Sequence, residues 1–535
     1  MSPFPLVSGL TGGGMRPLTP MVYGLVGYVL WRLWRFTIRP FVTPNSPREL
    51  SYTIPFIGHA ISMLRDPHAL LSSTIKYCNS SWEPVALTIF GHTVIFVFSE
   101  QDATEVLRER PDIIHTEHIK DLLHGLGCSG PGISEIDNDH QSTISVSGGK
   151  VIVTNRPSLY KVAEELMKKQ LLDRNLGNEL LARTLKVLET QARWGGIGTP
   201  TLLDASEDGQ NLTVSLWKWA QVASIRAITT AWFGNAIWEL SPSIIDDHIQ
   251  VDHGLWQLLF RIPKPFAREV YAARARVQHC LVEFLRLPES KKGDQSWAIK
   301  AAVAEMRIRG MSEEDMASYL LMVFWATNAN TFKIVFWLIA HIASNPATLE
   351  AVTTEVASIL SADAPEPESL SLSSLSIGLE RNPLLEALYN EVHRIALSTS
   401  SARTMRQDVT INGRIFKAGT HTVVPYRQLA MSHPLLSQDW DLFRPERFLS
   451  NPELGQSKSF LPFGGGKHKC VGRFLSRRLV LTFTALLVHR FTIRPLDQLP
   501  EMGFRPVSSG PGSPISDMRL VISRRQGQED EVSPT

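Results

Sequence analysis

The stretch FLPFGGGKHKCVGR, residues 460–473, decides how the rest of this chain is interpreted. Its three consecutive glycines let the backbone turn tightly and approach a flat ligand closely. They lead to Cys470, and an apolar run with helical character, FLSRRLVLTFTALLVHRF, follows. A thiolate at Cys470 would be stabilised by the positive end of that helix, by its free N–H groups and by Lys467, His468 and Lys469.

A stabilised thiolate has two chemical uses, and the residues alone leave both open. It can act as a nucleophile, which requires a nearby base such as His468, or as a metal ligand. A phosphate-binding loop is disfavoured, because GGGKHKC lacks the G-x-x-x-x-G-K-S/T spacing. The other cysteines, Cys78, Cys128 and Cys280, form no C-x-x-C pair, so neither a disulfide framework nor a tetrahedral zinc site is indicated.

The spacing Phe463-x-x-Gly466-x-His468-x-Cys470-x-Gly472 resembles the haem-binding signature of the cytochrome P450 family. The resemblance implies haem b as the cofactor and the Cys470 thiolate as the axial ligand of its iron, which favours O–O cleavage. It also implies that Phe463 shields the sulfur and that Gly466 permits the turn of the loop. Gly472 would let the next helix lie close to the porphyrin, and His468 would contact a haem propionate.

Residues further upstream are similar to the same family, and the resemblance covers about residues 50–525. Glu391-x-x-Arg394 is similar to the E-x-x-R motif, and Arg447 to the third member of the buried Glu-Arg-Arg network. We expect these three to fix the cysteine loop through ion pairs rather than to take part in chemistry. Arg403 resembles a strand arginine that meets a propionate. Without the resemblance, an exposed helix ion pair and a surface arginine are the alternatives.

The longest predicted helix begins at the cap Ser312 and ends before Pro346. It resembles the family's distal helix, but Ala329 and Asn330 stand where an acid and a threonine usually relay protons to dioxygen. This variant resembles the branch that contains the sterol 7α- and 12α-hydroxylases and prostacyclin synthase. Monooxygenation would then need Asn330, Thr331 or ordered water for proton delivery. Alternatively, the enzyme rearranges a peroxide or dehydrates its substrate, which needs no reductase.

The middle of this helix supplies two sets of candidates for the wall of the site. The polar set either bonds to the backbone one turn back or contacts water or a ligand; it comprises Thr327, Asn328, Asn330 and Thr331. The apolar set would form a wall suited to a lipophilic substrate; it comprises Phe324, Trp325, Ala326 and Ala329.

Composition excludes several other classes of protein. With 43% hydrophobic and 20% charged residues, the 535-residue chain is globular and can bury a large core. The formal net charge is only +2, and basic and aromatic residues are not clustered beyond the N-terminal flank, so no nucleic-acid partner is indicated.

The N-terminal run at 17–31, PLTPMVYGLVGYVLW, carries no charge, and aromatic residues interleaved with arginines follow it. Residues 17–38 are long enough for an anchor helix that spans a membrane, and the arginines after it predict a catalytic body in the cytosol. We therefore expect a single-pass protein of the endoplasmic reticulum; a cleaved signal peptide is the alternative. The expected segments are a tail at 1–16, the membrane anchor helix at 17–38, a proline-rich extended linker at 39–54, the catalytic domain at 55–525 and a polar tail at 526–535.

The predicted fold class is mostly α, an α+β fold of the cytochrome P450 type with small sheets. We expect a β-hairpin at 85–90 and 93–98, and further strands at 408–415 and 420–424. Residues 125–155 predict a long polar loop.

One family feature is missing from the early part of the chain. No Trp-x-x-x-Arg that would match the propionate-binding helix occurs between residues 110 and 175. Arg156 or Lys161 are the candidates to replace it.

These observations together predict a membrane-anchored haem-thiolate monooxygenase. It would insert one oxygen atom from O2 into a lipophilic small molecule, such as a sterol, terpenoid or polycyclic natural product of secondary metabolism. Its expected partners are this substrate, O2, membrane lipid and an NADPH-dependent cytochrome P450 reductase, which supplies electrons. The alternatives are a peroxide isomerase or dehydratase on the same scaffold, which needs no NADPH, and a haem-binding sensor without turnover.

Overall fold

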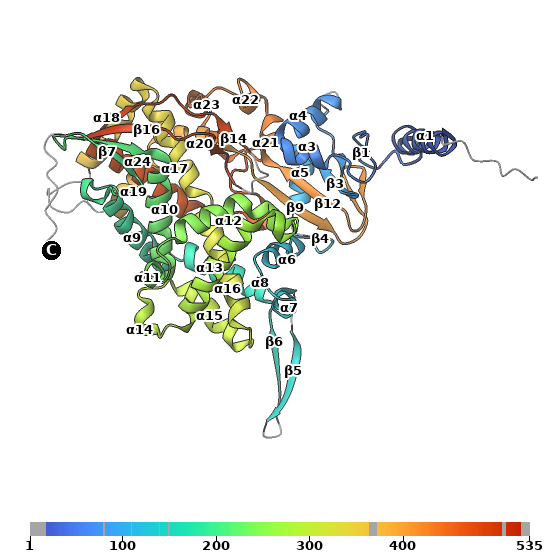
Figure 1. Cartoon of the computed structure of the whole chain (residues 1–535), viewed down its shortest axis with the longest axis horizontal. Helices are drawn as coiled ribbons and strands as arrows, with labels where there is room; N and C mark the ends of the chain where they lie inside the picture. The colour runs from blue at the N-terminus through green and yellow to red at the C-terminus, as the bar shows by residue number, and fades with distance from the viewer. Residues whose placement is uncertain are drawn as a thin grey trace, which may run out of the picture.

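The computed structural model is mostly helical, with small β-sheets grouped on two sides of the helical body (Figure 1). It describes residues 18–78, 81–108, 110–137, 140–147, 150–362, 372–504 and 510–525. The predicted mostly helical fold class is confirmed. The two predicted tails, 1–16 and 526–535, lie outside the described residues.

The larger sheet lies at the end of the body nearest the N-terminal helix (Figure 1). Its strand order is β1-β2-β3-β12-β9-β4. The bounds are Arg48–Glu49 (β1), Val85–Ile89 (β2), His92–Phe96 (β3), His421–Pro425 (β12), Ser400–Met405 (β9) and Ile113–Ile114 (β4). The predicted hairpin is confirmed as β2 and β3, whose β-branched residues suit strands. Strand β9 places Arg403 opposite Thr422 of β12.

A second sheet of four strands lies across the helical body, in the order β13-β16-β8-β7. The bounds are Phe491–Pro495 (β13), Arg519–Arg524 (β16), Asn211–Ser215 (β8) and Leu202–Ala205 (β7). The strand predicted at 408–415 is a hairpin of β10 (Val409–Ile411) and β11 (Arg414–Phe416). Asn412 and Gly413 both have positive φ, which makes the tight hairpin turn that the Asn-Gly pair favours.

Long helices form the body around one large apolar core. Trp219, Trp232, Phe324 and Trp337 are among its largest fully buried side chains. The helices of the body include α4 (Pro67–Tyr77), α5 (Glu100–Leu107), α6 (Thr116–Gly125), α8 (Leu159–Leu172), α9 (Arg174–Gln191), α10 (Leu216–Phe233), α12 (Ile244–Leu259), α13 (Arg268–Arg286), α14 (Glu289–Lys292), α15 (Trp297–Ile308), α18 (Pro346–Ala362), α19 (Leu372–Glu380), α20 (Pro383–Ala396), α23 (Glu446–Ser450) and α24 (Arg473–Arg490).

The helix predicted from Ser312 begins at its expected cap, because the Ser312 hydroxyl accepts a hydrogen bond from the Asp315 N–H. It is not continuous, however. It consists of α16 (Glu313–Asn328) and α17 (Thr331–Ala343), which we call together the distal helix. At the break, Asn330 has a φ of −115°, far from the helical value of about −63°. One turn earlier, Thr327 donates to the carbonyls of Val323 and Phe324, and such back-bonding bends helices.

The prediction of a long loop at 125–155 is wrong. The segment forms α7 (Gly130–Asp137) and a hairpin of β5 (His140–Ser147) and β6 (Lys150–Arg156), which projects from the body in Figure 1. Helix α7 is held at its start because Asp315 accepts hydrogen bonds from the N–H and the hydroxyl of Ser129. The two strands are rich in β-branched residues on either side of Gly148-Gly149, a pattern that indicates a hairpin.

The N-terminal segment is helical over α1 (Leu18–Arg32), a π-helical stretch (Leu33–Ile38) and α2 (Arg39–Val42). Helix α1 stands out from the body, and its apolar side chains are largely exposed (Figure 1). Strand β1, which lies in the segment expected as an extended linker, pairs with β2 of the sheet. Arg35 also binds both carboxylate oxygens of Glu49 in β1, at 2.8 and 3.0 Å.

No single helix among the described residues is long and apolar enough to cross a membrane. One bent pair, Glu313–Ala343 with Pro346–Ser361, reaches the required length and composition at an angle of 111°.

Candidate active site

Cys470 lies at the end of the glycine-rich loop, just before α24. Its N–H donates to the carbonyl of Phe463 at 2.8 Å, and its own carbonyl accepts from the Arg473 guanidinium at 2.7 Å. Burial raises the pKa of the thiol above its ordinary value, and the N–H groups of Gly472 and Arg473 with the charge of Arg473 only partly offset this, so the protein alone does not stabilise the expected thiolate. The side chain is nevertheless accessible to solvent. A side chain that is surrounded by protein and still accessible lies on the wall of an internal hollow.

The charge that acts on this thiol differs from the expected one. The sequence predicts stabilisation by Lys467, His468 and Lys469, but the structure assigns the cationic contribution to Arg473. Lys467 and Lys469 are exposed, and His468 faces a different cluster. Peptide N–H groups at the start of α24 therefore act together with Arg473 on the sulfur.

The loop that carries Cys470, residues 460–472, packs tightly on α5. Gly466 has a φ of +68°, and a Cβ atom added there would lie 2.2 Å from the carbonyl oxygen of Leu107. Only glycine fits this conformation and this approach. A Cβ atom on Gly472 would lie 3.8 Å from the Cys470 sulfur, which is ordinary contact. The half-buried Phe463 ring lies 4.9 Å from the ring of His393.

A buried ion-pair network joins α20 to the segment that precedes the loop in the chain. Arg394 donates to both carboxylate oxygens of Glu391 at 2.8 Å, and Arg447 lies 3.0 Å from the same carboxylate. Glu391 and Arg394 are fully buried. The remaining donors of both arginines bind backbone carbonyls, among them those of Leu435 and Trp440. The structure thus brings together the three residues of the predicted network, in which one carboxylate faces two guanidinium groups and backbone carbonyls accept the remaining donors.

Beside the loop, His468 belongs to a cluster of nitrogen and hydroxyl groups. Its ring stacks on His115 with 4.6 Å between centroids, and the Tyr160 hydroxyl lies 3.1 Å from His468 Nδ1 and 3.4 Å from His115 Nδ1. Burial and the charges of Arg403 and neighbouring histidines lower the pKa of His115 to about 3, so this imidazole is neutral. Burial raises the pKa of Tyr160 to about 12, so its hydroxyl keeps its proton.

Arg403 completes this cluster and carries an unused donor. The side chain is buried, its Nη1 donates to the carbonyl of Ala402, and its Nη2 has no hydrogen-bond partner within the described structure. A buried guanidinium N–H without a partner is costly and calls for an acceptor. A carboxylate is the acceptor that matches its geometry best.

His115 and Tyr160 were not predicted from the sequence. Tyr160 stands next to Lys161, which was a candidate replacement for the missing arginine, but Lys161 is exposed. The side chain of Arg156 lies outside the described residues. No local signal marks His115, because its contact with His468 joins segments that are far apart in the sequence.

The distal helix contributes the opposite wall. Ala326 is exposed although most of the residues around it are buried, and Trp325 is half-buried. The predicted apolar wall is only partly right: Phe324 and Ala329 are buried in the core, where Phe324 packs on the ring of Phe233 at 5.7 Å. Phe324 precedes Ala326 by two residues and therefore lies on the opposite face of α16.

The two candidate proton-relay residues contact other segments of the chain. The Thr331 hydroxyl lies 3.1 Å from the hydroxyl of Ser476 in α24. The amide oxygen of Asn330 lies against Gly510, where an added Cβ atom would meet it at 2.0 Å. The distal helix is thereby joined to α24 close to Cys470, so the walls that carry Ala326 and Cys470 converge at this contact.

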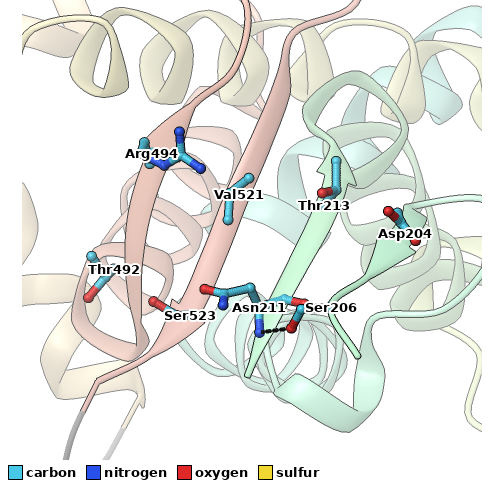
Figure 2. Close-up of a pocket in the computed structure, with 8 residues that line it drawn as sticks. All are labelled: Asp204, Ser206, Asn211, Thr213, Thr492, Arg494, Val521 and Ser523. Carbon is cyan, nitrogen blue, oxygen red and sulfur yellow. Dashed lines mark hydrogen bonds between the residues drawn. The ribbon is translucent and has the colours of Figure 1, made fainter. Parts of the chain in front are cut away.

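A different pocket lies on the four-stranded sheet (Figure 2). Its lining includes Asp204, Asn211, Thr213, Arg494 and Ser523, and none of its lining residues belongs to the cysteine loop or the distal helix. Figure 2 shows Arg494 and Asp204 on opposite sides of it, so they do not converge on a common point. This open, polar pocket carries no arrangement of reactive groups.

The site thus has three parts. They are a solvent-accessible cysteine that protein surrounds, a cluster around Arg403 with a free donor for a carboxylate, and an apolar wall. Haem requires the same three, since its iron needs a thiolate, its propionates need donors and its flat ring needs apolar walls. The described residues therefore fit haem, and the class they define is that of haem-thiolate proteins.

Comparison with known proteins identifies the family. The family model described as Cytochrome P450 matches residues 231–511, more than half of the chain. The chain belongs to the cytochrome P450 family, whose members use haem with an axial cysteine thiolate, and it is a cytochrome P450 monooxygenase.

Two relatives are similar over most of their length, and a third over half of its own. A cytochrome P450 monooxygenase of Gibberella zeae is 24% identical, with 95% of both chains covered. The cytochrome P450 monooxygenase efuG of Hormonema carpetanum is 23% identical over 89% of both chains. Prostacyclin synthase of Rattus norvegicus is 23% identical over 44% of this chain and 50% of its own.

Proposed function

We propose that this enzyme inserts one atom of O2 into a lipophilic small molecule, with Cys470 as the axial ligand of its haem. The observation that carries the proposal is the position of Cys470: the residue is accessible although protein surrounds it, just before α24 and at the end of the glycine-rich loop. A bound haem supplies the oxygen chemistry, and the protein binds it, positions the substrate and tunes the thiolate.

Each residue of the cysteine loop has a distinct task in this proposal. The N–H groups of Gly472 and Arg473 stabilise the negative charge on the Cys470 sulfur. Gly466 lets the loop lie against Leu107, and Gly472 leaves room beside the sulfur. Phe463 covers the loop from the side of His393. The Glu391, Arg394 and Arg447 network keeps the loop in place and does not touch the reacting atoms.

The cationic cluster would hold the haem propionates. Arg403 offers its free Nη2 donor, and His468, His115 and Tyr160 form a cluster of further polar groups next to it. This arrangement takes the place of the Trp-x-x-x-Arg pattern that the chain lacks.

Substrate class, reductase and cellular location are parts of the same proposal. Trp325 and Ala326 supply an apolar wall that suits a sterol, terpenoid or polycyclic natural product. Similarity to fungal monooxygenases supports a place in secondary metabolism. The exposed apolar helix α1 and the arginines after it support an anchor in the endoplasmic reticulum, with a cytosolic body that receives electrons from an NADPH-dependent cytochrome P450 reductase.

One observation favours a second candidate, a peroxide isomerase or dehydratase. Ala329 and Asn330 replace the acid and threonine, and part of the chain is similar to a prostacyclin synthase. Such a reaction would need neither NADPH nor a reductase.

The two candidates are separated by oxygen-18 labelling. The full-length, haem-loaded enzyme is incubated under ¹⁸O2 with a panel of sterols and terpenoids, with and without NADPH and reductase. Products that gain one ¹⁸O atom only in the presence of both support monooxygenation. Conversion of an added lipid hydroperoxide without NADPH, and no labelled product, would instead support the isomerase.

A further inference from the structure

A buried ion pair lies directly beside the break in the distal helix. Lys333, in the first turn of α17, donates to Asp252 of α12 at 2.7 Å, and the two side chains are 2% and 7% exposed. The other oxygen of Asp252 accepts from the Trp325 indole at 3.0 Å. Trp325 precedes the accessible residue Ala326. The pair therefore connects the wall of the site with a charged group deep in the protein.

The ammonium group of Lys333 also lies close to Asn330. A Cβ atom added to Gly510 would lie 2.0 Å from the Asn330 amide oxygen and 3.5 Å from Lys333 Nζ, so both atoms lie close to the same position. The amide oxygen and the ammonium group are thus near enough for one water molecule to bridge them. Lys333 has three N–H donors, of which one is used by Asp252 and others remain for such a water.

Nearby polar atoms are also suited to hold water. The ring of His248, one turn before Asp252 in α12, is buried and has only the backbone of Asn328 as a close polar neighbour within the described structure, without full hydrogen-bond geometry. The Oδ1 atom of Asn328 has no partner there, although its amide nitrogen donates to Thr229. Buried polar atoms of this kind are normally satisfied by ordered water. The interface between α12 and the distal helix is therefore a polar seam within an apolar core.

The charge state of the pair is fixed by its surroundings. Burial alone would raise the pKa of the Asp252 carboxyl, but the charges of Lys333 and His248 and the hydrogen bonds from Lys333 and Trp325 together keep the pKa below its usual range. Asp252 is therefore a carboxylate that anchors Lys333. Apolar side chains of similar size would hold the two helices together at least as well as a buried ion pair. Helix packing alone therefore does not explain why a charged pair is buried at this position.

We propose that Lys333, anchored by Asp252, is a positioning residue that orders the water through which protons reach the distal site. It would take over the role of the acidic residue whose place Ala329 occupies. This role rests on the proposed monooxygenase function. Protons enter from bulk water and pass along hydrogen-bonded water to the site. Lys333 keeps its own charge, and Asn330 holds the last water at the break, so no bond to the protein is made or broken.

The test compares variants of the full-length, haem-loaded enzyme, supplied with NADPH and reductase. Lys333→Met removes the ammonium, Lys333→Arg keeps a cation, and Lys333→Met with Asp252→Leu replaces the whole pair by apolar residues, which preserves folding. The matched control is Lys292→Met in α14, since Lys292 is also 2% exposed and also binds a carboxylate, that of Glu289, at 2.7 Å. Oxygen consumption and hydrogen peroxide per NADPH are measured in H2O and D2O, beside the CO spectrum and thermal unfolding.

We expect Lys333→Met and the double variant to slow oxygen consumption by about tenfold or more, as loss of assisted proton transfer does. They should also raise both the peroxide fraction and the solvent isotope effect, with an unchanged CO spectrum. Lys333→Arg should restore most of the rate, and Lys292→Met should leave all three readouts unchanged. If the double variant folds and its peroxide fraction and isotope effect equal those of the wild type, the role of Lys333 is wrong. If the wild type itself oxidises no NADPH, the proposed function fails, and this role fails with it.

Discussion

The two sides of the candidate haem site are held in different ways. On the cysteine side, one buried carboxylate, that of Glu391, binds two arginines, and a glycine-rich loop fits against α5 without spare room. On the distal side, the residues around the break in the helix contact Ser476, Gly510 and Asp252, which come from three separate segments. The first arrangement leaves little freedom, and the second can be altered without dismantling the fold.

The largest effect is expected when the carboxylate of the cysteine side is removed. Glu391→Gln leaves Arg394 and Arg447 buried without a counter-charge, which should destabilise the fold by about 3–5 kcal/mol. Haem content and soluble yield of the full-length protein measure this loss. The control is Glu386→Gln on the same helix, whose ion pair with Arg477 is half-exposed and should contribute less than about 1 kcal/mol. Equal effects of the two substitutions would contradict the rigid network.

A second substitution tests the fit of the loop against α5. Gly466→Ala places a methyl group 2.2 Å from the Leu107 carbonyl and in a left-handed conformation, so we expect loss of haem binding. Gly419→Ala is the matched control: Gly419 also has a positive φ, but no atom lies within 4 Å of its added Cβ. This control should cost only the conformational strain, about 1–2 kcal/mol. Haem titration of both variants measures the difference, and a haem-binding Gly466→Ala protein would show that the loop can move.

A third comparison tests the cationic cluster, which lies between the two sides. Arg403→Gln and His115→Phe should each speed transfer of haem to apomyoglobin by about tenfold, the loss of a charge-assisted hydrogen bond. His124→Phe, at an exposed position on α6, should not. With haem dimethyl ester, whose propionates carry no charge, the variants and the wild type should release haem at similar rates. A difference that persists with the ester would mean that these residues do not bind the propionates.

The smallest effect is expected at the distal contact with α24. Thr331→Val and Ser476→Ala each remove one hydrogen bond, which should cost about 1 kcal/mol in thermal stability. The double variant should cost no more than either single change, because both remove the same contact. If Thr331→Val instead abolishes NADPH-dependent oxygen consumption without changing stability, Thr331 itself handles protons and the distal side is less tolerant than we infer.

Local patterns predicted the cysteine side because its information is contained in short motifs. Gly466 and Cys470 lie four residues apart, and Glu391 and Arg394 lie three residues apart. Residues so close in the chain are placed relative to one another by the local helix or turn, so their arrangement can be predicted from the sequence. The cap at Ser312 and the hairpin of β2 and β3 were found in the same way.

The distal side could not be predicted to the same depth, because its contacts join distant segments. Nothing near Lys333 in the sequence indicates that Asp252 neutralises it, and nothing near Asn330 indicates Gly510. The helix break was missed because apolar periodicity continues through it, and the β5–β6 hairpin because turn residues hid the β-branched runs. Pairings of this kind depend on tertiary packing rather than on local propensity.

The most direct test of the central claim is the absorption spectrum of the dithionite-reduced, CO-treated, full-length protein. It is compared with Cys470→Ser and with Cys280→Ser, a buried cysteine of α13 that serves as the control. We expect a red-shifted Soret band of the thiolate type in the wild type and in Cys280→Ser, and we expect Cys470→Ser to lose it. The same band in Cys470→Ser, or a wild-type protein that binds no haem, would contradict the assignment of Cys470 as the iron ligand.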